Sequence, residues 1–492
     1  MIFNSLEFLV FFPIVTLLYF LLSHRMRWPL LLAASCFFYM AFVPVYILIL
    51  ALTIVVDYAA GIGIERSQGM RRKVILWGSL IVTALILFVF KYFDFFAWNA
   101  NHLAKLIGWN YSVGTLAILL PIGLSFHTFQ SMSYVIEVYR GAQKAERHFG
   151  IYALYVMFYP QLVAGPIERP QNLLHQFHTP HRFDYGDVTM GLRMMAVGFF
   201  KKIVIADNLS PLVNNAYADP AQQSAAALLV ATVFFAFQIY CDFSGYSSIA
   251  IGTARVMGFR LMTNFRRPYL ASSVAEFWTR WHISLSTWFK DYLYIPLGGS
   301  RVGRLRHLAN LMAVFLVSGI WHGANWTFII WGALHGSYLI AEQWTAGLRA
   351  HGRRAFGSGP ARFIPAVLGP LYVFALVTLG WVFFRAKTVP DALHICFRLP
   401  AGFLEIARNL AHPAAMRDLL GGLGMDATRF AFCAGLIVAL IAVEAVEEKA
   451  DMNAFLVSRP VWQRWALYYA CLLLLIFGSS LNSQQSFIYF QF

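Results

Sequence analysis

The sequence predicts an all-α polytopic integral membrane protein with about 11–13 transmembrane or re-entrant helices. Three observations support this fold class. Apolar residues make up 59% of the 492 residues and charged residues only 12%, which is about half the charged fraction of a soluble domain. Apolar runs of about 17 residues or more recur along the whole chain. Lys and Arg, which give a net charge of +15, gather in the short segments between these runs.

The basic residues therefore indicate orientation in a lipid bilayer and not nucleic-acid binding. The five cysteines are scattered and form no C-x-x-C pair, so we expect neither disulfides nor a cysteine zinc site. A histidine-rich tract at 175–181 contains Pro180 and has no carboxylate or thiol beside it. We expect a polar loop there and no metal site.

The first part of the chain alternates between apolar and basic segments. Helices are expected at 6–22, on either side of Pro44 within 29–60, at 74–96 and at 113–138. Basic segments lie at 24–27, 66–73 and 140–147, whereas the loop at 97–112 holds one Lys and no Arg. Cytoplasmic basic segments place the N-terminus outside the cytoplasm. The first apolar run has no basic start and no cleavage site, so we expect it to be retained as a helix.

The middle of the chain, from Tyr159 to Ala309, is broken by Pro, Gly and charged clusters. We expect short, tilted or re-entrant helices there around a partly polar cavity, since irregular backbone at membrane depth must be buried or line water. Asp242 falls in this region, and we favour a structural tie to a nearby arginine over a functional role.

The C-terminal part is simpler. Helices are expected near 363–384, 430–447 and 464–481, with a loop or amphipathic region at 385–429 and an aromatic end, 487–492, at a membrane interface. We expect one membrane-embedded domain over 1–492, with peripheral helices at about 1–140, a core at about 150–345 and C-terminal helices at about 360–485.

The apolar stretch 311–340 carries unusual polar residues, which are Ser318, His322, Asn325 and His335. The first three are spaced four and then three apart, so they share a face if they lie in one helix. Such residues cost a few kcal/mol each at membrane depth and persist where they face a cavity, a partner or a reaction path. A hydrogen-bonded tie between helices is the competing explanation for His322.

A second histidine, His282, lies in the aromatic and cationic segment 276–292. Trp278 and His282 are four residues apart, so a helix here presents aromatic and cationic faces together, as at a membrane interface. An aromatic belt that contains a bystander histidine has the same pattern.

Several separated motifs together resemble the membrane-bound O-acyltransferase (MBOAT) family, and most of all its bacterial alginate O-acetylase branch. They are FWTRWH at 277–282, DYLYIPLGG at 291–299, SGIWHG at 318–323, PQLVAGPI at 160–167, YCDFSGY at 240–246 and FIYFQF at 487–492. Along this chain the motifs occur in the same order as in that family, and together they span nearly the whole chain, which makes the resemblance specific.

The resemblance implies a multi-helix fold around a central tunnel with two signature histidines. His322 matches the family's active-site histidine and His282 its second, more variable position. Family members move an acyl group from a thioester donor to a hydroxyl or a carrier. The alginate branch acetylates an exported polysaccharide together with periplasmic partner proteins, which implies the bacterial inner membrane and a periplasmic N-terminus.

The chemistry agrees with these roles. A neutral imidazole can accept a hydroxyl proton near pH 7, so we expect His322 to be the general base. His282 is expected to orient the donor carbonyl or the acceptor, or to donate to the oxyanion. Trp321 and Asn325 flank the base and are expected to hold its ring. A covalent acyl intermediate on Ser318 has little support, because no nucleophile elbow surrounds it.

Further residues complete the predicted site. Asp242 and Trp281 are candidates for the tunnel lining, together with Trp321, Asn325 and Ser318. A basic cluster can guide a phosphate-bearing donor, or it can be ordinary positive-inside anchoring; its members are Arg280, Lys290, Arg301, Arg304 and Arg306. We expect no bound cofactor or metal, with acetyl-coenzyme A or another acyl thioester as the donor substrate.

Other readings stay open. The acceptor can be peptidoglycan or cellulose, or the reaction can pass a D-alanyl group toward teichoic acid. From a different class, a transporter that carries an acyl group or glycan without chemistry predicts an internal repeat, which the sequence does not show.

Overall fold

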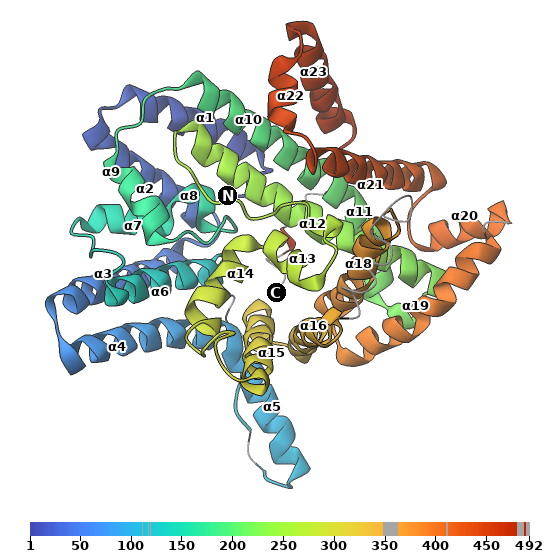
Figure 1. Ribbon diagram of the computed structural model, residues 1–492, viewed down its shortest axis with the longest axis horizontal. Coiled ribbons are helices and arrows are strands. Elements are labelled where there is room, and N and C mark those ends of the chain that lie inside the picture. The colour runs from blue at the N-terminus through green and yellow to red at the C-terminus, as the bar shows by residue number, and fades with distance from the viewer. Residues whose placement is uncertain are drawn as a thin grey trace. The chain divides into compact units, whose positions relative to one another are not determined.

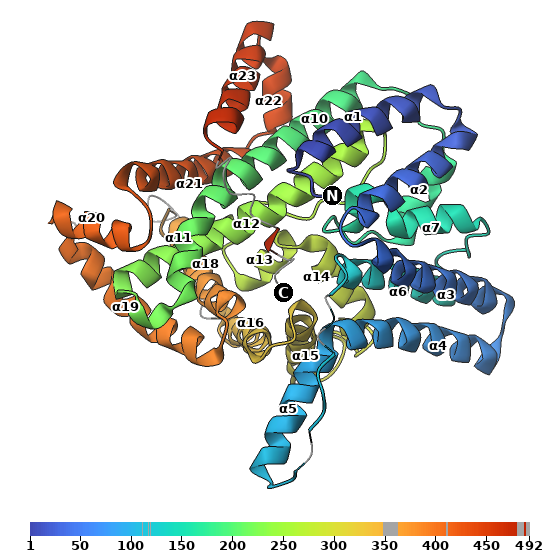
Figure 2. The ribbon, with the colours of Figure 1, turned by 180° about the vertical axis from the view of Figure 1, so that it is seen from behind.

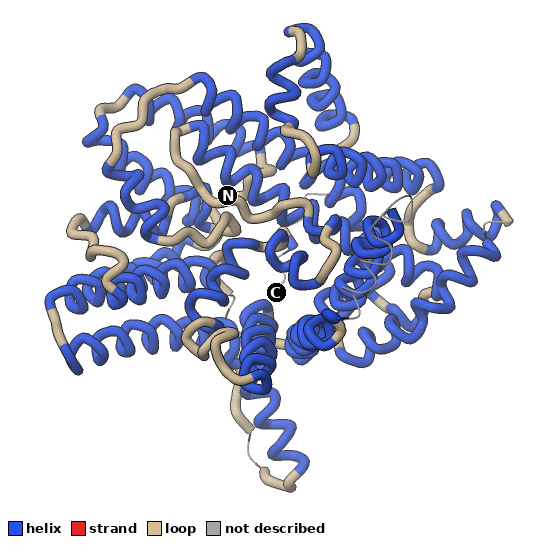
Figure 3. The backbone as a smooth tube through the Cα atoms, in the orientation of Figure 1, coloured by secondary structure: helices blue, strands red, loops and turns tan. Residues whose placement is uncertain are grey.

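The computed structural model describes residues 1–110, 112–116, 118, 120–347, 363–409, 412–479 and 487–488. These residues form helices joined by loops and turns, and no strand occurs among them (Figure 3). The predicted all-α class is therefore confirmed.

Several helices suit a membrane by length and composition. Five described helical segments are long and apolar enough to cross it: Pro44–Arg66, Gly69–Leu106, Ala225–Val256, Val367–Arg385 and Ala427–Glu447. The helices Leu6–Leu21 and Val461–Phe477 are apolar but shorter. The protein is thus a multi-pass membrane protein, while the total of 11–13 embedded segments and the central tunnel stay predictions.

The chain divides into two compact units. Unit 1 comprises Met1–Val197 and Tyr246–Thr263, and unit 2 comprises Gly198–Gly245 and Asn264–Phe492. The chain passes from unit 1 to unit 2 within one helix, Tyr185–Phe199, and returns within another, Ala225–Val256. All the predicted site residues belong to unit 2.

Unit 1 is built from the N-terminal helices. In chain order these are α1 (Leu6–Leu21), α2 (His24–Met40), η1 (Pro44–Tyr46), α3 (Ile47–Arg66), α4 (Gly69–Leu87), η2 (Phe88–Tyr92), α5 (Phe93–Leu106), α6 (Leu124–Arg140), α7 (Phe149–Met157), α8 (Tyr159–Leu162), α9 (Pro170–His178) and most of α10 (Tyr185–Phe199). Helices α3, α4 and α6 pack side by side (Figure 1, Figure 2).

Unit 2 contains the remaining helices. They are η3 (Phe200–Ala206), α11 (Asp207–Ala218), η4 (Pro220–Gln222), most of α12 (Ala225–Val256), η5 (Pro268–Leu270), α13 (Val274–Arg280), α14 (Ile283–Phe289), η6 (Lys290–Tyr294), α15 (Arg304–His322), α16 (Trp326–Trp344), α18 (Phe363–Arg385), α19 (Val389–Asn409), α20 (Pro413–Gly422), α21 (Ala427–Glu447), α22 (Met452–Ser458) and α23 (Val461–Phe477).

The predicted helices near 6–22, on both sides of Pro44, and near 363–384, 430–447 and 464–481 are confirmed. Several boundaries predicted in unit 1 were wrong. The helix expected at 74–96 runs without a break from Gly69 to Leu106, because the chain stays helical through a π-helical turn at Phe88–Tyr92 and on into the first part of the expected polar loop. The basic residues at 24–27, expected as a turn, form the first turn of α2.

Helix α6 also starts later than expected, at Leu124 and not near 113. Gly123 precedes it with φ +77°, a left-handed conformation that glycine adopts without strain. A Cβ on Gly123 would lie 2.7 Å from the carbonyl oxygen of Leu162, so this close approach also requires glycine.

The middle of the chain is less broken than its Pro and Gly content suggested. Helix α12 is continuous over 32 residues. Its glycines serve close packing instead of ending the helix. In unit 1, a Cβ on Gly252 would lie 2.5 Å from the carbonyl oxygen of Gly191 in α10, so the two backbones are in contact there.

Candidate active site

A tightly packed helical hairpin, α15 and α16, carries the polar residues of 311–340. A Cβ on Gly319 would lie 2.3 Å from the carbonyl oxygen of Phe328, and a Cβ on Gly332 would lie 2.3 Å from that of Phe315. The two helices therefore approach at backbone contact, as small residues permit in membrane helices.

His322 is the last residue of α15 and is 5% exposed. Its ring centroid lies 4.9 Å from that of Trp321, 4.9 Å from that of Trp331 in α16 and 5.3 Å from that of Phe384 in α18. Aromatic rings from three helices thus surround the imidazole, and each ring is held by the packing of a helix.

The prediction that Ser318, His322 and Asn325 share one helical face was wrong. Ser318 and His322 lie in α15, but the helix ends at His322, since Gly323 is extended. Asn325 caps the next helix, and its Oδ1 accepts a hydrogen bond of 3.1 Å from the Thr327 backbone N–H. Its Nδ2 donates to the Lys387 carbonyl oxygen at 3.1 Å. Asn325 therefore stabilises the turn of the hairpin and does not continue the face of His322.

His282 was expected within one helix together with Trp278, and this was also wrong. Helix α13 ends at Arg280, and His282 precedes α14 with φ +43°. The left-handed conformation costs a non-glycine residue about 1–3 kcal/mol and persists only where its surroundings enforce it. Here Asn264 does so, because its carbonyl oxygen accepts from the Ile283 N–H at 2.9 Å.

The side chain of Asn264 also holds the ring of His282. Its Oδ1 accepts from the Ser284 hydroxyl at 2.9 Å and lies 3.1 Å from His282 Nδ1. A carbonyl oxygen can only accept, so the contact assigns the proton to Nδ1 and leaves Nε2 as the acceptor nitrogen. His282 is 0% exposed, and burial lowers its pKa to about 3, so the imidazole is neutral at pH 7.

The two histidines lie on either side of one indole. Trp321 is 4.9 Å from His322 and 6.3 Å from His282, centroid to centroid. Trp281, a candidate for the tunnel lining, is 1% exposed, and its ring lies 4.9 Å from that of Trp381. Unit 2 thus brings His282, Trp321 and His322 together.

Asp242 is a structural tie, but its partner is not an arginine. Lys202 Nζ lies 2.6 Å from Asp242 Oδ1 and 2.8 Å from Asp207 Oδ1, and all three side chains are buried. The π-helical turn η3 carries Lys202 into the interior, where a long flexible amine can reach both carboxylates. The other Asp242 oxygen accepts from the Ile488 N–H at 2.7 Å.

The hydrogen bond between Ile488 and Asp242 contradicts the prediction that the aromatic end of the chain lies at a membrane interface. Phe487 and Ile488 are 2% and 3% exposed, so they are buried in unit 2 and do not lie at an interface. Phe487 lies 5.6 Å from Phe243, whose ring is 4.6 Å from His282. Residues 489–492 lie outside the described residues.

The five predicted donor-binding cations do not form one group. Arg280 forms ion pairs with Glu276 at 2.6 Å and Glu448 at 2.9 Å. Lys290 is exposed and 3.9 Å from Asp291. The other three, Arg301, Arg304 and Arg306, are exposed around the start of α15. A binding site for a phosphate-bearing donor therefore depends on Arg301, Arg304 and Arg306.

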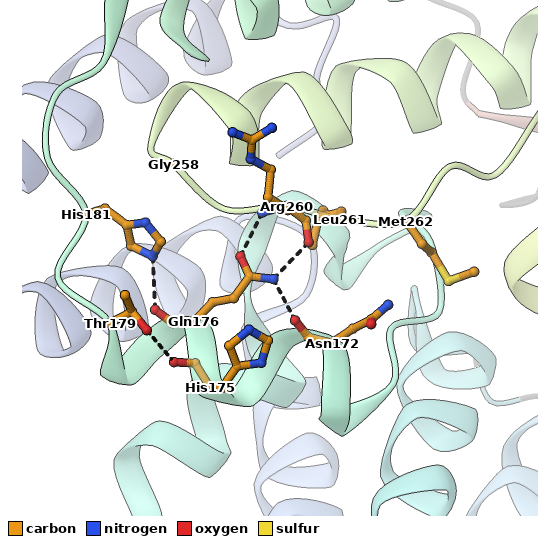
Figure 4. Close-up of a pocket in the computed structure, with 9 residues that line it drawn as sticks. All are labelled: Asn172, His175, Gln176, Thr179, His181, Gly258, Arg260, Leu261 and Met262. Atoms are coloured by element: carbon orange, nitrogen blue, oxygen red, sulfur yellow. Dashed lines mark hydrogen bonds between the residues drawn. The ribbon is translucent and has the colours of Figure 1, made fainter. Parts of the chain in front are cut away.

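The histidine-rich tract lies in unit 1 and borders a cavity of about 570 Å³ (Figure 4). Residues 175–178, expected in a loop, form the last turn of α9. Gln176 joins this helix to the segment after α12, since its Oε1 accepts from the Arg260 N–H at 2.8 Å and its Nε2 donates to the Arg260 carbonyl oxygen at 2.9 Å. None of the predicted site residues lines this cavity.

Sequence reasoning missed Asn264, Trp331 and Phe384. Trp331 lies nine residues after His322 in the same apolar stretch. If that stretch forms a helical hairpin, the two residues can face each other, and this spacing was the signal that the sequence offered. Asn264 and Phe384 reach the site only through tertiary structure, and nothing in their neighbours in the sequence marks them.

Comparison with known proteins supplies the family. A family model described as MBOAT, membrane-bound O-acyltransferase family, matches residues 147–378. The chain is 42% identical to a probable alginate O-acetylase of Pseudomonas aeruginosa over 80% of this chain and 73% of that protein. It is 36% identical to a peptidoglycan O-acetyltransferase of Helicobacter pylori over 80% of this chain and 79% of that protein.

A more distant relative is a teichoic acid D-alanyltransferase of Streptococcus thermophilus, 30% identical over 46% of this chain and 58% of that protein. Two of these relatives are named as transferases and the third as a probable O-acetylase, and the matched region contains both histidines. The reading as a transporter without chemistry is thereby set aside. The chain belongs to the membrane-bound O-acyltransferase family and is a multi-pass membrane acyltransferase.

Proposed function

We propose that this protein moves an acetyl group from a cytoplasmic thioester donor, such as acetyl-coenzyme A, across the bacterial inner membrane for O-acetylation of an exported polysaccharide. Alginate is the favoured acceptor, because the relatives that match at about 40% identity over 80% of the chain are named probable alginate O-acetylases. The N-terminus is periplasmic in this arrangement, and periplasmic acetyltransferase proteins receive or deliver the acetyl group.

His322 acts as the general base. The acceptor hydroxyl oxygen attacks the thioester carbonyl carbon while the imidazole takes the hydroxyl proton. The C–O bond forms, the C–S bond breaks, and the departing thiolate takes the proton back from the imidazolium. Such a base contributes about 10²- to 10⁴-fold in rate. The observation that carries this role is a buried imidazole at a helix end, in contact with aromatic rings from three helices.

His282 orients the acceptor. With its proton on Nδ1 toward Asn264, the Nε2 atom accepts a hydrogen bond and cannot donate one to an oxyanion. Its low pKa keeps the ring neutral. Of the three roles expected for His282, this arrangement favours holding the acceptor hydroxyl group. The exposed Arg301, Arg304 and Arg306 attract the phosphates of the donor at the cytoplasmic surface.

The test is genetic and biochemical. Deletion of the gene is expected to remove O-acetyl groups from one envelope polymer, and the wild-type gene is expected to restore them. The His322→Ala variant is expected to insert into the membrane at the wild-type level but to restore nothing. Labelled acetyl transfer by isolated membranes measures the same step directly. Transfer by the His322→Ala variant at the wild-type rate would refute the general-base role.

A second candidate acceptor is peptidoglycan, which the 36% identity to the Helicobacter pylori enzyme favours. The D-alanyl reaction and cellulose acetylation use the same chemistry. Acetyl analysis of alginate, peptidoglycan and cellulose from the deletion strain, with D-alanine analysis of teichoic acid where the cell makes it, separates these acceptors.

A further inference from the structure

Four aromatic side chains, one of which contacts His322, carry buried polar atoms without a hydrogen-bond partner in the part of the chain that the structure describes. They are Trp278, Trp331, His335 and Tyr338. No described residue forms a hydrogen bond with Trp278 Nε1, Trp331 Nε1, Tyr338 Oη or either ring nitrogen of His335, and all these atoms are buried. His335 itself is 0% exposed.

These four side chains are in mutual contact. The ring of His335 lies 5.0 Å from Trp278, 4.9 Å from Trp331 and 5.5 Å from Tyr338. Trp278 and Trp331 are 5.7 Å apart. Trp331, His335 and Tyr338 follow one face of α16 at spacings of four and three, and Trp278 faces them from α13. Packing thus gathers the atoms from two helices.

An unpaired buried donor is costly, and several together need an explanation. The donor inventory limits what can satisfy them. The two indole N–H groups can only donate, and a neutral imidazole donates once and accepts once. The ring contacts described for these four side chains are with other aromatic rings and with His322. The complementary group is therefore an uncharged oxygen that accepts hydrogen bonds, such as a carbonyl oxygen.

We propose that Trp278, Trp331 and His335 bind the carbonyl oxygen of the acyl donor. This inference rests on the proposed function, since it assumes a thioester donor. Trp331 connects the two sites, because its ring also lies 4.9 Å from His322. A carbonyl held at this indole is next to the candidate base, which is where attack on the acyl carbon takes place.

Gly380 allows the backbone of α18 to approach the imidazole of His335 closely. A Cβ at position 380 would lie 2.8 Å from His335 Nε2 and 3.6 Å from Trp331 Cδ1. Any side chain there displaces His335 from its position against Trp331. Gly380→Ala is therefore expected to weaken binding of the carbonyl group without removing a polar atom.

The experiment measures binding of two unreactive ligands to the full-length protein in detergent or nanodiscs. S-Acetonyl-coenzyme A carries a ketone, and S-propyl-coenzyme A has a methylene in its place. The wild type is expected to bind the ketone about tenfold more tightly, as one or two neutral hydrogen bonds allow. His335→Phe is expected to bind both ligands equally within about twofold, and Trp278→Phe tests the site again if the first variant does not fold.

The matched control is His127→Phe, which removes another buried histidine, in α6 of unit 1. It is expected to keep the wild-type preference for the ketone. Equal affinity of the wild type for the two ligands, or a preference that survives in both His335→Phe and Trp278→Phe, overturns the proposal. A site that holds only water gives the first of these results.

Failure of the proposed function has a different signature. If the His322→Ala variant still transfers acetyl groups, the general-base role of His322 is refuted, and the comparison of the two ligands still tests the carbonyl site. A His322→Ala variant that loses transfer but keeps the ketone preference supports the two sites separately.

Discussion

Unit 2 buries polar residues in two different ways. In the ionic cluster, the amine of Lys202 lies 2.6–2.8 Å from the carboxylates of Asp207 and Asp242. In the histidine cluster, His282, His322 and His335 lie among aromatic rings, and the neutral side chain of Asn264 positions His282.

The difference shows why polarity at membrane depth does not by itself identify an active site. Charges that are paired at contact distance are locked, since moving one leaves the others uncompensated. A neutral imidazole carries a ring nitrogen that can accept a proton from a hydroxyl group. The histidine cluster therefore suits chemistry, and the ionic cluster suits the support of the fold.

The largest expected effect comes from His322→Gln. Glutamine keeps a similar size and can form hydrogen bonds, but it cannot accept the proton, so acetyl transfer is expected to fall by about 10²- to 10⁴-fold. Initial rates with labelled donor in membranes measure this. Stability is expected to stay at the wild-type level, and His127→Gln, in unit 1, is the control for loss of a buried histidine. A rate within threefold of wild type would place His322 with the structural residues.

In the ionic cluster, the next largest expected effect is on stability and not on acetyl transfer. Lys202→Met leaves two buried carboxylates without a cation and is expected to lower the free energy of unfolding by about 3–5 kcal/mol. Unfolding in mixed micelles with rising SDS content measures the change. Adding Asp207→Asn and Asp242→Asn to Lys202→Met removes the uncompensated charges and is expected to recover most of the loss. If Lys202→Met unfolds like the wild type, the cluster does not support the fold.

A smaller effect is expected within the histidine cluster from Asn264→Ala. The variant removes the side-chain acceptor that places the proton on His282 Nδ1 and keeps the backbone carbonyl that accepts from the Ile283 N–H. Acetyl transfer is expected to fall about tenfold, which corresponds to one hydrogen bond to a buried group. Ser286→Ala is the matched control, since the Ser286 hydroxyl donates to the Trp281 carbonyl oxygen in the same turn and the substitution leaves the backbone unchanged. Equal rates for the two variants would contradict a role for the tautomer.

The smallest effect concerns charges outside both clusters. Replacing Arg301, Arg304 and Arg306 by Gln is expected to raise the KM for a phosphate-bearing donor a few-fold at low salt and to leave kcat unchanged. The difference from wild type should shrink at about 0.5 M salt, because exposed charges are screened. A KM that does not change at low salt would assign the three arginines to membrane orientation alone.

Much of the fold follows from local patterns. The apolar runs predict α1, α3, α18, α21 and α23 to within a few residues, because burial in lipid demands long uninterrupted apolar segments. The errors lie at helix ends and joints. The π turn at Phe88–Tyr92 and the break after His322 depend on how neighbouring helices pack, and no local pattern reports that packing.

The sequence by itself determined the membrane environment and the all-α class, since composition and the length of the apolar runs express them directly. The resemblance of its motifs to a known family singled out His282 and His322 as the candidates for chemistry. Only the tertiary structure decided which groups surround those histidines. Asn264 reaches His282 from 18 residues away, and Phe384 reaches His322 from a helix 62 residues further along. It also paired Asp242 with Lys202 and not with an arginine. Contacts of this kind depend on the packing of helices that are distant in the chain, so they are properties of the folded molecule and not of any one segment.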